Sequence, residues 1–68
     1  MSSFGDTLSS LRQREGLTQT ELAKDLGLSR SALSMYESGE REPSFRILFR
    51  IASRLGVDMN TLLSWPPK

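Results

Sequence analysis

Apolar residues recur along this chain at three- and four-residue intervals, and glycines interrupt the recurrence. Because residues i, i+3, i+4 and i+7 share one face of an α-helix, each apolar run predicts a helix with one buried side. No useful length of the chain alternates between apolar and polar residues, so we expect no β-strands. The pattern predicts five helices, at about residues 4–15, 19–26, 30–38, 45–55 and 59–63.

Glycines and small polar residues mark where these helices end and begin. Four glycines stand where an apolar period stops, which is the position at which left-handed backbone ends a helix; they are Gly16, Gly27, Gly39 and Gly56. A side-chain oxygen just before a periodic segment can accept from the free N–H groups of its first turn. Such residues precede all five segments, as Ser3, Thr18, Ser29, Ser44 and Asp58. Thr18 and Glu21 have the spacing of a capping box.

The spacing also assigns an inward face to each helix. The predicted core residues are Phe4, Leu8, Leu11, Leu22, Ala23, Leu26, Ala32, Leu33, Tyr36, Ile47, Leu48, Ile51, Ala52, Leu55, Met59, Leu62 and Leu63. Pro66 prevents the last helix from continuing into the short tail at 64–68. We therefore predict an all-α fold, a compact five-helix bundle in which residues 1–68 form a single domain.

The composition excludes several classes of function. The chain has no cysteine and no histidine, so disulfides and the commonest zinc ligands are absent, and we expect neither a metal nor a cofactor. It has no glycine-rich phosphate loop and no evident pair of carboxylates, which argues against an enzyme. No apolar run approaches the ~20 residues that span a bilayer, so we expect no membrane partner and a cytoplasmic location.

The overall charge decides little, but the placement of the basic residues matters. Nine basic and eight acidic residues give a net charge of +1, which is too balanced to indicate nucleic acid. Most of the basic residues are arginine, whose planar fork suits phosphate and guanine. Arg46, Arg50 and Arg54 recur every four residues, so one side of the fourth predicted helix is basic.

Residues 19–37, "QTELAKDLGLSRSALSMYE", contain two short predicted helices joined at one glycine. Neither helix can bury its apolar face alone. Ala23 is small enough for a neighbouring helix to approach, Gly27 provides a sharp turn, and Leu33 anchors the second helix to the core. The residues that remain outward on that second helix are Arg30, Ser31, Ser34 and Met35.

These residues resemble the Cro/cI-type helix-turn-helix family, or XRE family, of phage and bacterial repressors. The matching positions are Gln19, Ala23, Gly27 and Leu33, within "LTQTELAKDLGLSRSALSMYESG", followed by "EPS" and "LGVDMNTLL". The resemblance covers roughly residues 6–64 and places the helix-turn-helix motif at about 19–38. It implies a lambda-repressor-like fold whose third helix enters the major groove of DNA.

The resemblance also implies roles for individual residues. The positions matching base-reading residues are Ser29, Arg30, Ser31, Ser34 and Met35. Arginine can bond guanine O6 and N7 together, which makes Arg30 the sharpest candidate. Ser29 is first a helix cap, and Met35 is equally well explained as an exposed edge of the core. The candidates for phosphate contact are Thr18, Gln19, Ser38, Arg41 and Arg46, although Glu40 and Glu42 beside Arg41 would oppose a phosphate.

Two further pairs follow from the resemblance. Arg12 and Glu37 match a salt bridge inside the domain, and we favour this structural role of Arg12 over a contact with DNA. Leu63 and Trp65 are candidates for a dimer interface. Trp65 is explained equally well as a lid on the core of its own monomer.

The resemblance therefore predicts a transcriptional regulator that binds double-stranded DNA in a sequence-specific manner. We expect a repressor, bacterial or phage-encoded, that binds a palindromic operator as a homodimer. The alternative is an antitoxin that binds a toxin and represses its own operon with the same fold. A protein partner would then be such a toxin, or an anti-repressor.

Overall fold

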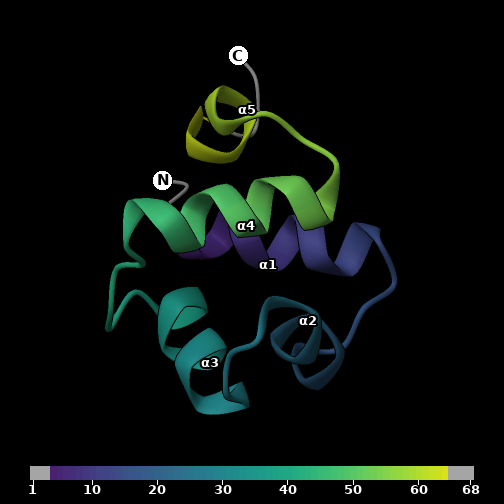
Figure 1. Ribbon diagram of the computed structural model, residues 1–68, viewed down its shortest axis with the longest axis vertical. Coiled ribbons are helices and arrows are strands. Elements are labelled where there is room, and N and C mark those ends of the chain that lie inside the picture. The colour runs from purple at the N-terminus through teal and green to yellow at the C-terminus, as the bar shows by residue number, and fades with distance from the viewer. Residues whose placement is uncertain (1–3, 65–68) are drawn as a thin grey trace.

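The computed structural model describes residues 4–64, and these residues form five helices and no strand (Figure 1). The helices are α1 (Phe4–Arg14), α2 (Gln19–Leu26), α3 (Arg30–Ser38), α4 (Phe45–Leu55) and α5 (Met59–Ser64). Three of the five match the predicted bounds, while α1 ends one residue earlier and α5 one residue later than expected. The predicted all-α, five-helix fold is confirmed.

Side chains satisfy the free N–H groups at the helix starts as the sequence predicts. The Thr18 hydroxyl accepts from the Glu21 N–H at 3.1 Å, and the Glu21 carboxylate accepts from the Thr18 N–H at 2.9 Å, so the capping box is formed. Ser29, Ser44 and Asp58 cap α3, α4 and α5 in the same way. Ser3, the fifth predicted cap, lies outside the described residues.

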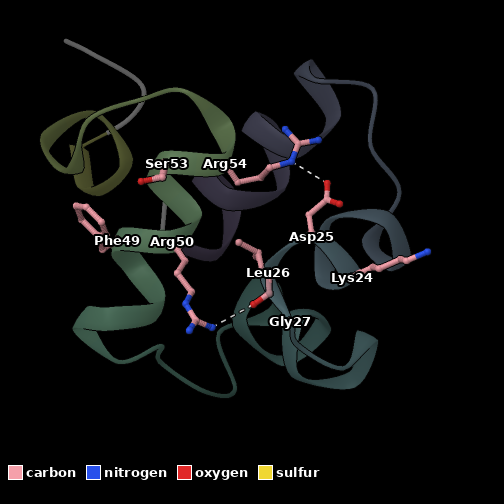
Figure 2. A pocket seen from close by; sticks show the side chains of 8 residues that line it. All are labelled: Lys24, Asp25, Leu26, Gly27, Phe49, Arg50, Ser53 and Arg54. Atoms are coloured by element: carbon pink, nitrogen blue, oxygen red, sulfur yellow. Dashed lines mark hydrogen bonds and ion pairs between the residues drawn. The ribbon is translucent and has the colours of Figure 1, made fainter.

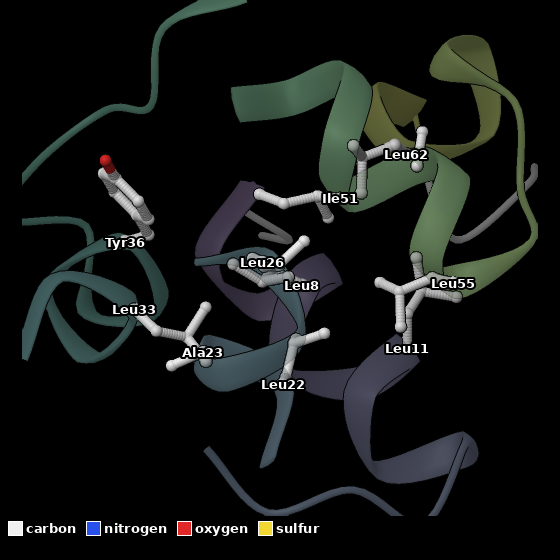
Figure 3. Packing of buried hydrophobic residues seen from close by; sticks show 11 residues of the cluster. Leu8, Leu11, Leu22, Ala23, Leu26, Leu33, Tyr36, Ile51, Leu55 and Leu62 are labelled. Atoms are coloured by element: carbon white, nitrogen blue, oxygen red, sulfur yellow. The ribbon is translucent and has the colours of Figure 1, made fainter. Parts of the chain in front are cut away.

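One hydrophobic core holds the five helices together (Figure 3). The helix α1 lies against α3 and α5, while α2 packs against α3 and α4. The largest side chains that are fully buried are Leu8, Leu11, Leu22, Leu33, Ile51 and Leu62. Each helix contributes at least one of them, so all five helices share this core.

Leu63 is the error among the predicted core residues, because 57% of it is exposed. Its neighbour Leu62 is fully buried, and successive residues of a helix point about 100° apart. A helix as short as α5 therefore has room for only one of the two leucines in the core. Phe45 and Phe49 on α4 are also exposed, by 74% and 59%.

Gly5 brings the start of α1 into direct contact with the end of α3. It is buried, and a Cβ atom built on it would lie 2.3 Å from the carbonyl oxygen of Glu37. Only glycine allows the two backbones to approach so closely. This contact fixes the C-terminal end of α3 against α1.

Candidate nucleic-acid interface

The outward face of α3 carries the five residues predicted to read bases. Ser29, Arg30 and Ser31 are exposed, and Ser34 and Met35 are half-buried. Ser29 lies at the N-cap just before α3, and the other four lie within the first six residues of the helix, while Leu33 anchors it to the core. The hydroxyl of Ser29 is engaged as a cap, since it accepts from the N–H of Ala32 at 3.0 Å.

Arg30 is the free cation of this face. It is exposed and forms no ion pair with any residue between 4 and 64. Its five N–H groups are therefore available to a ligand in front of α3. The half-buried state of Met35 fits both interpretations of that residue, the core edge and the base contact.

The start of α2 presents a second group of donors. The first N–H groups of a helix have no intrahelical acceptor, and the helix dipole there favours an anion. Thr18 is exposed at this end, while Gln19 is half-buried. The side-chain amide of Gln19 donates to Glu37 Oε1 at 3.1 Å, which links the start of α2 to the C-terminal end of α3.

Arg12 of α1 and Glu37 of α3 form a close ion pair. Arg12 Nε lies 2.7 Å from Glu37 Oε2, and Arg12 Nη2 lies 3.2 Å from Oε1. Arg12 Nη1 also donates to the carbonyl oxygen of Leu17 at 2.7 Å. The two side chains are only 12% and 8% exposed, so the guanidinium is directed into the domain.

Glu37 is thus the point at which three helices are joined. Its carboxylate accepts from Arg12 of α1 and from Gln19 of α2, while Glu37 itself lies near the end of α3. The contact with Gln19 was missed by the sequence analysis. It joins residues 18 positions apart, and no local pattern of the sequence indicates it.

The last residue of α3, Ser38, and the loop that follows it, with Arg41, hold two of the predicted phosphate ligands. The Ser38 hydroxyl donates to the carbonyl of Met35 at 3.1 Å, and the backbone N–H of Arg41 donates to the same oxygen at 3.3 Å. The side chain of Arg41 is exposed, as are those of its acidic neighbours Glu40 and Glu42. The loop therefore folds back on α3, and the positive charge of Arg41 and the negative charges of Glu40 and Glu42 are all exposed to solvent.

The basic side of α4 divides into two parts. Arg50 Nη1 donates to the carbonyl of Leu26 at 3.4 Å, and Arg54 Nε bonds Asp25 Oδ2 at 2.7 Å (Figure 2). Arg46, at the start of α4, is exposed and has no such partner within the described part of the chain. The even spacing in the sequence gave no indication of this difference.

Leu63 and Trp65 are the two candidates for a dimer interface. Leu63 lies exposed on α5, whereas Trp65 is outside the described residues.

Within residues 4–64, no group of three acidic, histidine or cysteine side chains could hold a metal ion. No helix in that range is long and apolar enough to cross a membrane.

The arrangement defines a class of domain, a five-helix bundle with a helix-turn-helix formed by α2 and α3. The family model described as helix-turn-helix matches residues 8–62. The chain belongs to this family, and the predicted resemblance is confirmed.

Two curated relatives show what this chain is similar to. The ImmF control region 10 kDa protein of Bacillus phage phi105 is 43% identical over 87% of this chain and 66% of its own length. Antitoxin PezA of Streptococcus pneumoniae is 38% identical over 79% of this chain but 34% of its own length. The chain spans about half to two thirds of the first curated relatives it matches, from 52% to 66%.

Among solved structures, the P22 c2 repressor in complex with a synthetic operator superposes with a TM-score of 0.87. It is 26% identical in sequence, and the superposition covers 94% of this chain and 97% of that one. The similarity therefore extends over the whole bundle, including the helix-turn-helix.

Proposed function

We propose that this chain is a sequence-specific binding domain for double-stranded DNA and acts in a transcriptional repressor. The observation that carries the proposal is the outward face of α3, where an unpaired Arg30 projects from a helix whose other end is fixed by Glu37. A rigidly held helix with free donors can enter the major groove and read base edges. The operator complex of the similar P22 c2 repressor supports this use of the fold.

The proposed contacts fall into two groups. Arg30 reads guanine, and Ser29, Ser31, Ser34 and Met35 line the same face of α3. Phosphates are bound around this face by the side chains of Thr18, Gln19, Ser38, Arg41 and Arg46. Phosphate contacts fix the orientation of the domain and carry no sequence information directly, whereas the contacts of α3 select the site.

We further propose that the regulator binds as a homodimer to a palindromic operator. One α3 helix is only nine residues long and can read a small part of a site. A two-fold dimer reads two half-sites about one helical turn, ~10 bp, apart. Leu63, exposed on α5, is the candidate anchor of the dimer together with Trp65.

Selection of bound duplexes from a random DNA pool tests both proposals. We expect a palindromic consensus whose half-sites are about one helical turn apart. Affinity for that duplex should fall steeply as salt rises, because bound arginines release condensed counterions. A pool with no enriched sequence would contradict specific DNA binding, and a non-repeated consensus bound by one monomer would contradict the homodimer.

The second candidate function is an antitoxin, favoured by the similarity to PezA. In that case the chain would bind a small toxin protein and repress its own operon. Co-expression with a small protein encoded beside the gene tests it. A stable complex that relieves growth arrest by the neighbour would favour the antitoxin, and a neighbour without effect on growth would count against it.

A further inference from the structure

An open groove of about 610 Å³ lies between the C-terminal end of α2 and the outer side of α4 (Figure 2). The side chains that matter for its chemistry are Lys24, Asp25, Phe49, Arg50, Ser53 and Arg54. None of them belongs to the proposed DNA surface. That surface uses Gln19 at the opposite end of α2, Arg46 at the start of α4, and α3 from Ser29 onward, which begins two residues after Gly27 of the groove.

The groove is strongly cationic for a chain of nearly balanced charge. Three of its side chains carry a positive charge and one a negative charge, whereas the whole chain has a net charge of +1. Arg50 gives one N–H to the carbonyl of Leu26, and Arg54 gives its Nε proton to Asp25. A guanidinium has five N–H groups, so both arginines keep donors for an incoming acceptor.

An apolar surface lies beside these donors. Phe49 is 59% exposed and lies at one end of the groove in Figure 2, while Lys24 lies at the other. Phe45, one helical turn earlier, extends the exposed aromatic surface along α4. Exposed aromatic side chains grouped in this way are typical of surfaces that bind another protein.

We propose that this groove binds an acidic peptide segment of a partner protein. Carboxylates of the segment bond Arg50 and Arg54, and an apolar side chain of the segment packs on Phe49. The segment would contact side chains of α2 and α4, whereas bases would be contacted from α3, so different side chains of the domain serve the two partners. The site would connect the DNA-bound regulator to a second protein.

Charge argues against the two other occupants. Residues at a two-fold axis meet their own copies, so a second copy whose axis passes through the groove would place its cationic residues opposite one another. A DNA phosphate would bond the arginines but would leave the exposed Phe49 without a partner. An acidic and partly apolar peptide satisfies both the arginines and the phenylalanine.

The test uses a random library of short displayed peptides selected on the whole chain, with enriched peptides then synthesised and labelled for fluorescence anisotropy. Enriched sequences should combine acidic residues with an aromatic or aliphatic residue. Ser53→Glu, which adds a negative charge to the groove and removes no known contact, should weaken binding about tenfold or more. Ser10→Glu, which places the same charge on an exposed position of α1, is the matched control and should bind as the wild type does.

Phe49→Ser tests the apolar half of the site and should also weaken the peptide. Four results would overturn the proposal: no enrichment, enrichment of sequences that are not acidic, equal peptide affinity of Ser53→Glu and Ser10→Glu, or loss of a dimer in Phe49→Ser. A duplex affinity that falls much further in Ser53→Glu than in Ser10→Glu would instead assign the groove to DNA. Failure of DNA binding in the wild type would leave the peptide measurement unaffected.

Discussion

The two ends of α3 differ in almost every physical respect. At the C-terminal end, Glu37 is 8% exposed, bonds Arg12 and Gln19, and lies against the backbone of Gly5. At the N-terminal end, Arg30 and Ser31 are exposed, and Arg30 has no ion-pair partner within the described residues. Contacts with α1 and α2 fix the C-terminal end of α3, which we call the held end. The N-terminal end is exposed to solvent, and we call it the free end.

This difference separates stability from recognition. A change at the held end removes contacts among α1, α2 and α3, so it should unfold or loosen the domain. Replacing Arg30 or Ser31 at the free end breaks no side-chain hydrogen bond or ion pair within the described residues, so it should alter only what the domain binds. The predictions below either break this separation or define it more closely.

The largest expected effect is that of Arg12→Ala at the held end. Removing the arginine leaves the partly buried Glu37 carboxylate without its main partner, at a cost of about 3–5 kcal/mol. A core of this size supplies only about 3–5 kcal/mol in total, so the variant should be largely unfolded at room temperature. Circular dichroism during thermal unfolding measures this effect.

Arg14→Ala is the control on the same helix, because its pairing with Glu15 is exposed and 3.8 Å long. An exposed pair contributes at most about 1 kcal/mol, so this variant should melt close to the wild type. If Arg12→Ala instead melted normally and bound DNA weakly, Arg12 would be a DNA ligand and the held end would not be purely structural.

Gly5→Ala should have the next largest effect. The added methyl group would meet the carbonyl of Glu37 at 2.3 Å, so α1 and α3 must move apart. Such overpacking costs about 1–3 kcal/mol. Chemical denaturation should show the loss, and Ser10→Ala, an exposed change on α1, should show none of it. Equal stability of the two variants would mean that the close contact of the two helices contributes nothing.

At the free end, Arg30→Ala should leave the unfolding midpoint unchanged and lower operator affinity by about 1–3 kcal/mol. The loss should be confined to the operator, and preference at one base pair of each half-site should relax. Gln19→Ala should weaken binding of the operator and of a scrambled duplex alike, because the proposed contact of Gln19 is with phosphate. It should also lower the unfolding midpoint, because it removes the hydrogen bond to Glu37. Titrations of both variants at one salt concentration compare these effects. Equal loss on both duplexes in Arg30→Ala would make Arg30 a phosphate ligand.

The contrast also shows what the sequence could and could not predict. Helix bounds followed from local signals, because caps such as Thr18 and left-handed glycines such as Gly27 act within a few residues. The core followed from periodicity, except in α5, where two adjacent leucines compete for one buried position. Local signals do not extend to pairs such as Gln19 and Glu37 or Arg54 and Asp25, which only the packing of the helices brings together.

The candidate site was predictable to the same degree. The outward residues of α3 followed from the inward ones, and the family resemblance supplied their proposed roles. The division of the α4 arginines was not predictable, because Arg50 and Arg54 differ from Arg46 only in their position relative to the end of α2. The close approach at Gly5 likewise depends on the crossing of α1 and α3, which periodicity does not determine.

The smallest predicted effect is a pH-dependent loss of stability at Asp58, which lies away from both ends of α3. This effect should change the stability of the domain and leave its DNA binding unaltered. The backbone N–H of Thr61 donates to the Asp58 carboxylate at 2.6 Å and holds the pKa of that group below its ordinary value of 3.8. Folding therefore favours the charged form of Asp58, and the stability that this form adds to the folded state is present above pH 3.8. This added stability is lost as the pH falls from 3.8 through the lower pKa that Asp58 has in the folded state.

Asp58→Asn keeps an oxygen acceptor at the cap but cannot titrate, so its unfolding midpoint should fall less over this acidic range. Operator affinity at neutral pH should be unchanged, and an acid loss in the variant equal to that of the wild type would show that the cap does not contribute to the pH dependence.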